Sequence, residues 1–260
     1  MKKVFNIIST FLLIYFSFYY ANNVSNFIKN KDPIMVKIKN NLDKYYKESV
    51  NATISNNTII PGISGIEIDI DSSYKNMKKI NAYKESMLVF KSIKPDISLI
   101  NQFDKIIISG NQDKSNVSIL LKIDDINILK KIINKKEIEN INFIFSTSFI
   151  KENYYFLKTL QNNIIVSHDD NFINEFDIID YCYTTNLNIN SNCYTLNKYT
   201  IFPNTITHNY YFNTFKILNN GSIISYNITS DTSINEIVLI IKEINDMNYK
   251  IVKLNELLKE

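Results

Sequence analysis

Two adjacent carboxylates, Asp124 and Asp125, are the first candidates for chemistry in this chain. They follow residues 117–123, an apolar run that has the length of a buried strand. Acidic side chains at the end of a strand can act as a general base or hold a metal ion. The same pair can instead cap a following helix, because its oxygens accept hydrogen bonds from the free backbone N–H groups of the first turn. The residues alone leave both interpretations open.

Two histidines, His168 and His208, are available for metal binding or proton transfer. His168 directly follows the apolar stretch 163–167, whereas His208 lies in a stretch that matches no motif. A neutral imidazole is a common metal ligand and exchanges protons near neutral pH. A histidine taken alone is more often a hydrogen-bonded structural residue, so His168 gains meaning only beside the two acids.

The elements that would position these residues alternate between strands and helices. Such an alternation indicates parallel strands joined by helical crossovers. It continues to the end of the chain, which favours an α/β barrel over an open antiparallel sheet. We expect strands at 117–123, 141–147, 163–167, 221–227 and 249–254, and helices at 126–133, 151–161 and 233–247.

The first 25 residues have the features of an export signal. Lys2 and Lys3 precede an apolar stretch, 4–21, whose length of about 18 residues is at the lower limit for crossing a bilayer. Tyr19 lies where a signal peptidase requires a small residue. We therefore expect an uncleaved signal-anchor in residues 1–25, in the cell membrane, with the rest of the chain extracytoplasmic. Secretion after signal cleavage and a buried helix of a cytosolic domain are the alternatives.

An N-terminal extension is expected over residues 26–111. The spacing of apolar residues predicts an amphipathic helix over 33–50, with a simple linker as the alternative. Strict alternation over 66–71 predicts a strand, followed by a helix that Ser72 or Ser73 caps. The strand would place three carboxylates on one face, where they could bind a hard cation such as calcium or simply face solvent. These carboxylates are Glu67, Asp69 and Asp71.

Cys182 and Cys193 are the two cysteines of the chain. An exported protein can keep a disulfide, and a bridge across this short loop would contribute about 3 kcal/mol of stability. Two buried thiols are the alternative, and neither arrangement supplies the four ligands of a structural zinc site. Tyrosines gather in the same region and could stack on sugar rings, although the tyrosine content of the chain explains the cluster equally well. They are Tyr181, Tyr183, Tyr194, Tyr199, Tyr210 and Tyr211.

The layout of the C-terminal part resembles the polysaccharide deacetylase family, which is built on the NodB-homology domain. The similarity rests on the order of strands and helices, on Lys-Ile-Asp-Asp at 122–125, on the strand that ends at His168, and on the terminal unit 221–258. It implies an α/β fold of that family's type, a distorted (β/α) barrel. The deacetylase-like domain would span residues 112–260.

The preceding residues resemble the extension of membrane-anchored, Firmicute-type members of that family. The matching segments are 58–71 and the lead-in 106–111. The similarity therefore covers residues 58–260 and predicts three parts, a signal-anchor at 1–25, an extension at 26–111 and the deacetylase-like domain.

The family's catalytic motifs transfer only in part to this chain. The resemblance implies that Asp124 is a vestigial catalytic base and that Asp125 and His168 belong to a vestigial metal site. The family's second metal-binding histidine corresponds to Phe172, and its later catalytic histidine corresponds to Asn227. An oxygen ligand would have to replace the missing imidazole on the metal. The available replacements are Asp169, Asp170 and Asn171.

The composition accounts for further gaps in the same site. All 29 basic residues are lysine, and the chain has neither arginine nor tryptophan, both of which the family uses in its active site. Three family roles require histidine, but the chain has two histidines. A formal net charge of +3 without arginine also excludes a typical nucleic-acid-binding protein.

The N-terminal signal-anchor and these gaps together predict an exported, membrane-tethered, deacetylase-like protein. It would bind cell-wall glycan or a wall-synthesis partner without turnover and without a cofactor. The first alternative is a working N-deacetylase on peptidoglycan or related amino-sugar polymers, which would need a divalent metal such as zinc. The second is a structural surface protein that binds neither glycan nor metal. Protein partners cannot be inferred from the sequence.

Overall fold

The computed structural model describes residues 2–160, 165–167, 176–189, 191–206 and 218–260. The chain divides into two compact units. The first comprises Met1–Glu48 and Gly65–Ile93, and the second comprises Ser49–Ser64 and Lys94–Glu260. The second unit therefore contains parts of the predicted extension in addition to the predicted deacetylase-like domain.

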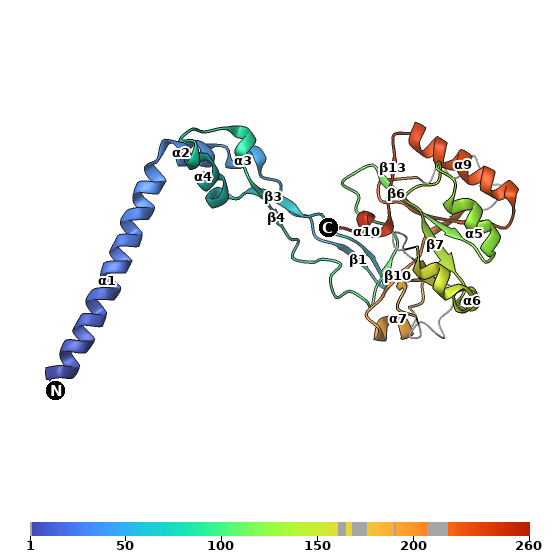
Figure 1. Cartoon of the computed structure of the whole chain (residues 1–260), viewed down its shortest axis with the longest axis horizontal. Coiled ribbons are helices and arrows are strands. Elements are labelled where there is room, and N and C mark those ends of the chain that lie inside the picture. Colours follow the sequence, from blue (N-terminus) through green and yellow to red (C-terminus); the bar gives the residue numbers. More distant parts are fainter. Residues whose placement is uncertain (1, 161–164, 168–175, 190, 207–217) are drawn as a thin grey trace. The chain divides into compact units, whose positions relative to one another are not determined.

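The first unit is built from helices and one antiparallel pair of strands (Figure 1). Its elements are α1 (Lys2–Lys31), α2 (Pro33–Asn40), α3 (Leu42–Tyr45), β3 (Gly65–Ile68), α4 (Ile70–Lys79), a 3-10 turn (Glu85–Met87) and β4 (Phe90–Ile93). Apolar side chains from α2, β3 and α4 form a small core together with Leu88. The buried members of this core are Ile34, Ile38, Ile68, Met77 and Leu88.

The helix predicted over 33–50 is wrong as a single element. Asn41 interrupts it with a backbone φ of −102°, and the following helix, α3, ends at Tyr45. The Asn41 side chain donates a hydrogen bond back to the Lys37 carbonyl oxygen at 2.8 Å. Asparagine forms such local bonds readily, which explains why it ends α2 inside an otherwise helical apolar pattern.

The strand predicted over 66–71 ends early, at Ile68. Asp69 is the N-cap of α4, and its carboxylate accepts hydrogen bonds from the backbone N–H of Ser72 at 3.0 Å and from the Ser72 hydroxyl at 2.7 Å. The expectation that Ser72 or Ser73 caps this helix is therefore wrong, because Ser72 is the donor and Asp69 the cap. A capping aspartate continued the alternating pattern by chance.

The three carboxylates of this segment have separate partners. Glu67 pairs with Lys91 at 2.9 Å, Asp71 pairs with Lys29 at 2.6 Å, and Asp69 caps α4. Among the described residues, no group of three or more His, Cys, Asp or Glu side chains could hold a metal ion. The calcium alternative thus receives no support.

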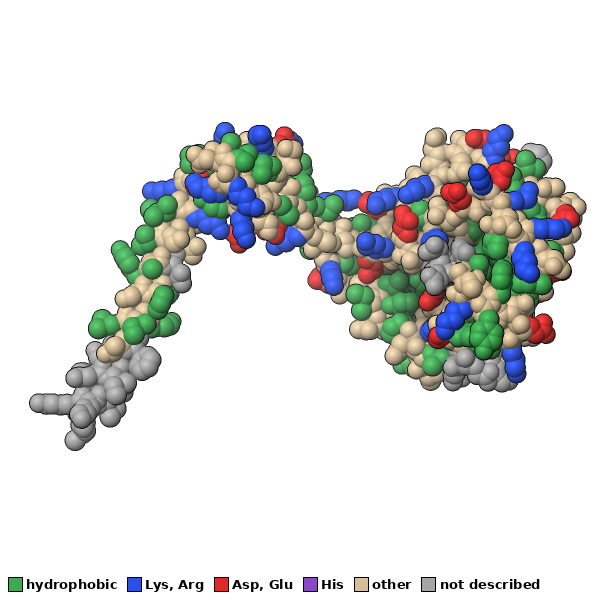
Figure 2. Space-filling view, viewed as in Figure 1, with side chains coloured by type: hydrophobic (Ala, Val, Ile, Leu, Met, Phe, Trp, Pro, Cys, Tyr) green, Lys and Arg blue, Asp and Glu red, His purple; other side chains and the backbone are tan. Residues whose placement is uncertain are grey.

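Helix α1 carries exposed hydrophobic side chains between Leu12 and Ile28 (Figure 2). Within the described residues, no helix has an apolar stretch long enough to cross a membrane. The signal-anchor expected in residues 1–25 stays a prediction.

Asp32 joins α2 to α4 through one carboxylate. It accepts hydrogen bonds from the backbone N–H of Ile34 at 2.9 Å, from the Tyr74 hydroxyl at 3.0 Å and from the Lys78 ammonium at 2.6 Å. The hydrogen bond from Lys78, followed by that from Ile34, lowers the pKa of Asp32 below its ordinary value of 3.8. Since the ionised form is favoured in the folded state, its stabilising effect is complete above the ordinary pKa and is lost as the pH falls through the lowered one.

We expect the amide protons of α2 to lose hydrogen-exchange protection as the pH falls from 5 to 3, after correction for intrinsic exchange rates. In Asp32→Asn, protection should be lower at pH 5 and should depend less on pH, because the titrating group is gone. Equal pH profiles of wild type and variant would show that Asp32 does not link α2 to α4.

The second unit is centred on a sheet of eleven strands within the described residues (Figure 1). Their order is β1-β2-β5-β10-β9-β8-β7-β6-β12-β11, and β13 also pairs with β6. All pairings are parallel except β1 with β2. The strands are β1 (Thr53–Ser55), β2 (Thr58–Ile60), β5 (Ile106–Ile107), β6 (Asn116–Lys122), β7 (Asn142–Phe145), β8 (Ile165–Ser167), β9 (Ile179–Tyr183), β10 (Tyr199–Ile201), β11 (Asn204–Ile206), β12 (Ile223–Asn227) and β13 (Lys250–Ile251).

The predicted α/β class and parallel pairing are confirmed, and each predicted strand after residue 115 overlaps an observed one. Barrel closure is not seen: in the residues described, the terminal strands β1 and β11 do not pair with each other. The helices are α5 (Ile126–Ile133), α6 (Thr147–Lys158), α7 (Ser191–Thr195), α9 (Asp231–Asp246) and α10 (Leu254–Leu257).

Strand β6 is covered on both faces. Ile119 and Leu121 join the large core that α5, α6 and α9 share, whereas Leu120 joins a second core with Leu254 and Leu257 of α10. Burial on both sides explains why the sequence of β6 is almost continuously apolar instead of alternating. Strand β6 is thus packed on both sides, and its end can position side chains.

A buried asparagine ties β6, β7 and α10 together. Asn142, fully buried on β7, donates hydrogen bonds to the Ser118 hydroxyl at 2.8 Å and to the Ile119 carbonyl oxygen at 3.1 Å. Its side-chain oxygen accepts a hydrogen bond from the backbone N–H of Leu254 at 3.1 Å. These contacts leave little of the side chain's hydrogen-bonding capacity unused, as a buried polar group requires.

Candidate active site

The carboxyl ends of β6, β7 and β12 meet at one edge of the sheet. Asn227, the last residue of β12, is in register with Lys122, the last residue of β6. Asp124 and Asp125 follow β6, and Ser146 follows β7. The parallel topology therefore brings the two acids and Asn227 to the same edge, as expected from the order of the elements.

Asp125 is the N-cap of α5. Its Oδ1 atom accepts hydrogen bonds from the backbone N–H groups of Asn127 at 2.7 Å and Ile128 at 3.1 Å. These donors belong to the first turn of the helix and would otherwise be unpaired. The helix-capping interpretation of the acid pair is thus confirmed for Asp125.

We expect Asp125→Ala to lower the free energy of unfolding by about 1 kcal/mol, because the cap is lost. Asp125→Ser should retain most of the stability, since serine is also a good N-cap. Urea denaturation followed by far-ultraviolet circular dichroism measures both. An equal loss of unfolding free energy in the two variants would contradict a capping role. Serine can replace aspartate as a cap, but it cannot replace a carboxylate that holds a metal ion.

Asp124 connects β6 to the following strand. Its Oδ1 atom accepts a hydrogen bond from the backbone N–H of Ser146 at 3.2 Å, and its side chain is exposed. The Ser146 hydroxyl in turn accepts a hydrogen bond from the backbone N–H of Phe149 at 3.3 Å and caps α6. Sequence reasoning missed Ser146, although a serine between an apolar strand and a helix is a recognised start signal.

Of the remaining predicted site positions, the structure describes only Asn227. Asn227 is exposed at the end of β12. His168, proposed as a metal ligand, lies outside the described residues, as does Phe172. The other positions outside them are Asp169, Asp170, Asn171 and His208.

The described part of this edge does not fit a catalytic divalent metal. Such a metal is commonly held by three protein ligands, among which imidazoles are frequent. The described residues supply the two carboxylates and the Asn227 amide, and no group of three or more His, Cys, Asp or Glu side chains forms among them. Both carboxylates accept hydrogen bonds from backbone N–H groups of their own fold.

Three of the four described tyrosines in the predicted cluster are part of the protein core. Tyr183 is buried, and Tyr181 and Tyr199 pack against the same apolar cluster. Burial raises the pKa of Tyr181 to about 12. The Tyr199 hydroxyl donates a hydrogen bond to the Leu99 carbonyl oxygen at 3.0 Å, so this side chain holds a loop in place. Tyr194 is exposed, and Tyr210 and Tyr211 lie outside the described residues.

Cys182 on β9 and Cys193 on α7 form a disulfide. Both are almost fully buried. Of the two arrangements that the sequence left open, the structure contains the bridge, which attaches α7 to the sheet.

The comparison with family models gives no match to this chain. YlxY, an uncharacterized protein of Bacillus subtilis (strain 168), is 32% identical over 95 residues, which are 36% of this chain and 30% of that protein. The chain thus matches less than a third of the length of that relative.

Two solved structures of a Bacillus anthracis protein share the fold. Wild-type BA3943, a CE4 family pseudoenzyme, matches with a TM-score of 0.56 at 19% identity, over 88% of this chain and 96% of that chain. A BA3943 mutant with restored enzymatic activity matches with a TM-score of 0.58 at 19% identity, over 87% of this chain and 98% of that chain. The shared fold thus spans most of both proteins.

One further curated protein resembles this chain in amino-acid sequence. ATP synthase subunit delta of Wigglesworthia glossinidia brevipalpis is 31% identical over 140 residues, which are 53% of this chain and 73% of that protein. Asn, Ile and Lys make up more than two fifths of this chain. Such a biased composition raises the identity expected with any similarly biased sequence, so the likeness in fold carries more weight than this alignment.

Proposed function

Because this chain has the polysaccharide deacetylase fold of the CE4 family, we propose that it is an exported protein that binds cell-wall glycan and has lost deacetylase activity. The observation that carries this proposal is that Asp124 and Asp125 already accept hydrogen bonds from the backbone. Asp125 caps α5, and Asp124 accepts a hydrogen bond from the Ser146 backbone. Both carboxylates have structural roles that persist without a metal.

The residue inventory supports the same proposal. A general acid contributes roughly 10²- to 10⁴-fold to such a reaction, and a side-chain amide cannot release a proton near neutral pH. Asn227 stands where the resemblance places that acid. The chain also lacks the arginine and the tryptophan of the family's site. A glycan could still lie along the strand ends, where Asp124 and Asn227 are exposed to solvent.

Export is part of the proposal. The disulfide between Cys182 and Cys193 supports it, because such bridges persist mainly in oxidising compartments outside the cytoplasm. The charged and apolar order of residues 2–21 is also that of an export signal.

Co-sedimentation with insoluble peptidoglycan tests the binding part of the proposal. We expect the purified chain to sediment with the glycan, and Asn227→Lys together with Asp124→Lys to weaken retention, because long charged side chains would obstruct the strand ends. The matched control places lysines at Asn134 and Glu137, which are exposed beyond the carboxyl end of α5. Failure of the unmodified chain to sediment would favour a structural surface protein and contradict the proposal.

A further inference from the structure

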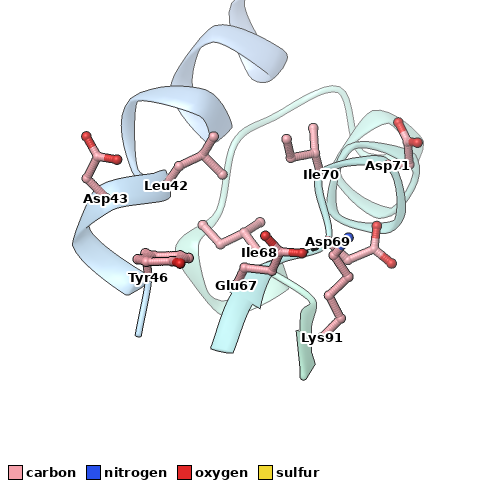
Figure 3. Close-up of a pocket in the computed structure, with 9 residues that line it drawn as sticks. All are labelled: Leu42, Asp43, Tyr46, Glu67, Ile68, Asp69, Ile70, Asp71 and Lys91. Carbon is pink, nitrogen blue, oxygen red and sulfur yellow. Dashed lines mark ion pairs between the residues drawn. The ribbon is translucent and has the colours of Figure 1, made fainter. Parts of the chain in front are cut away.

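A cavity of about 400 Å³ lies in the first unit, between α3, β3 and the start of α4 (Figure 3). Figure 3 shows the side chains of Leu42, Tyr46 and Ile68 around a common space, with the Glu67 carboxylate at its side. This volume is within the range of ligand-binding pockets. The lining consists of Leu42, Asp43, Tyr46, Glu67, Ile68, Asp69, Ile70, Asp71 and Lys91.

The charges of this lining are strongly unequal. The lining contains four carboxylates and one ammonium, a formal net of three negative charges, although the whole chain has a formal net charge of +3. The Lys91 ammonium pairs with Glu67 at 2.9 Å. Asp71 is also paired, with Lys29 at 2.6 Å. Asp43 and Asp69 therefore keep the cavity negative after both pairs are formed.

The pKa of Lys91 is raised by the carboxylates of the cavity. The hydrogen bond from its ammonium to Glu67 and the charge of Glu67 raise the pKa of Lys91 by more than desolvation lowers it, and the charges of Asp69 and Asp71 add smaller increases. A cation at this place is thus stabilised by several carboxylates at once. A second cation entering the cavity would meet the same carboxylates.

The apolar part of the lining restricts the kind of cation. Leu42, Ile68 and Ile70 offer aliphatic surface, and Tyr46 adds an aromatic ring whose face attracts cations. A lysine side chain combines a four-carbon apolar stem with a compact ammonium, so it can cover the aliphatic surface while its charge stays near the carboxylates. A bare metal ion would not use the apolar surface, and the described residues form no metal cluster.

We propose that this cavity binds a lysine side chain presented by a protein partner. The partner's stem would lie on Leu42, Ile68 and Ile70, and its ammonium would approach Glu67 and Asp69. The proposal concerns only the first unit and is independent of glycan binding by the second.

The test uses the full chain and two peptides that differ in one side chain. The probe is acetyl-Gly-Gly-Lys-Gly-Gly-amide, and the reference has norleucine in place of lysine, which keeps the stem and removes the charge. Binding is followed by nuclear magnetic resonance titration at low ionic strength. We expect chemical-shift changes around the cavity with the lysine peptide and none with the norleucine peptide.

Two variants, each with a matched control, should change the affinity for the lysine peptide in opposite directions. Lys91→Met should bind the lysine peptide about fivefold more tightly, because the resident cation no longer competes, and Glu67→Gln should bind it about fivefold more weakly. The controls are Lys44→Met and Glu85→Gln, which break an ion pair outside the cavity whose lysine has almost the same exposure, 58% against 57% for Lys91. Neither control should change the affinity.

Each other outcome overturns the proposal. Equal binding of both peptides would show that the charge is not recognised, and weaker or unchanged binding by Lys91→Met would show that the cavity carboxylates do not receive the ammonium. Shifts at the cavity with a glucosamine tetramer, but not with the lysine peptide, would assign the site to an amino sugar. Absence of binding to any of these probes would remove the proposed site.

Discussion

Replacing both Cys182 and Cys193 with alanine is expected to lower the free energy of unfolding of the second unit by about 3 kcal/mol. The bridge spans eleven positions and restricts the unfolded chain, so its removal favours the unfolded state. Both side chains are buried, and alanine fits the space without adding a polar group. Urea denaturation followed by circular dichroism at 222 nm measures the change.

Reduction of the wild-type protein serves as the control for this variant. Reduced wild type and the double alanine variant should unfold at similar urea concentrations, because both lack the covalent link. A double variant as stable as the oxidised wild type would contradict the role assigned to the bridge.

The second large effect is expected for Asn142→Leu. The substitution removes three hydrogen bonds and leaves the Ser118 hydroxyl, the Ile119 carbonyl and the Leu254 N–H without these partners in the core. Each buried group without a partner costs about 1–3 kcal/mol, so a total loss of at least about 3 kcal/mol is expected. Since Leu254 begins α10, this helix should also lose amide protection in hydrogen exchange.

A matched control for Asn142 is available on the surface. Asn134 also donates a side-chain hydrogen bond, to the Lys130 carbonyl oxygen at 2.9 Å, but it is exposed. Asn134→Leu should change stability by less than about 0.5 kcal/mol. Similar losses in the two variants would show that burial of Asn142 does not determine its contribution.

The central part of the sheet was predictable from residue types because its strands are apolar on both faces. Strands β6 and β7 lie where nearly continuous apolar runs occur, and the helical periods after β6 and β12 give α5 and α9. The helix starts were less accurate. Ser146, which caps α6, lies inside the range predicted as strand, because serine is compatible with either element.

Other strands could not be predicted because they are too short or too polar to show a period. Strand β5 has two residues, and β9 and β10 lie in a segment rich in tyrosine and asparagine. Their places in the sheet depend on contacts with distant strands, which a local pattern does not contain. The division of residues 26–111 between two compact units also depends on contacts between distant segments, so the local pattern did not predict it.

The roles of the two acids could be narrowed only by geometry. A carboxylate after a strand has the same sequence signature whether it caps a helix or binds a metal. The 2.7 Å hydrogen bond from the Asn127 N–H to Asp125 identifies the cap. The prediction that His168 belongs to a vestigial metal site falls outside the described residues and remains a prediction.

Acetate release is the measurement that tests the central claim most directly. Wild type and Asp124→Asn are incubated with N-acetylated peptidoglycan in the presence of added Zn²⁺, and free acetate is quantified. The account predicts that both proteins release acetate only at the rate of the buffer with Zn²⁺ alone. Release by the wild type that Asp124→Asn abolishes would contradict it, because Asp124 would then be a working catalytic base.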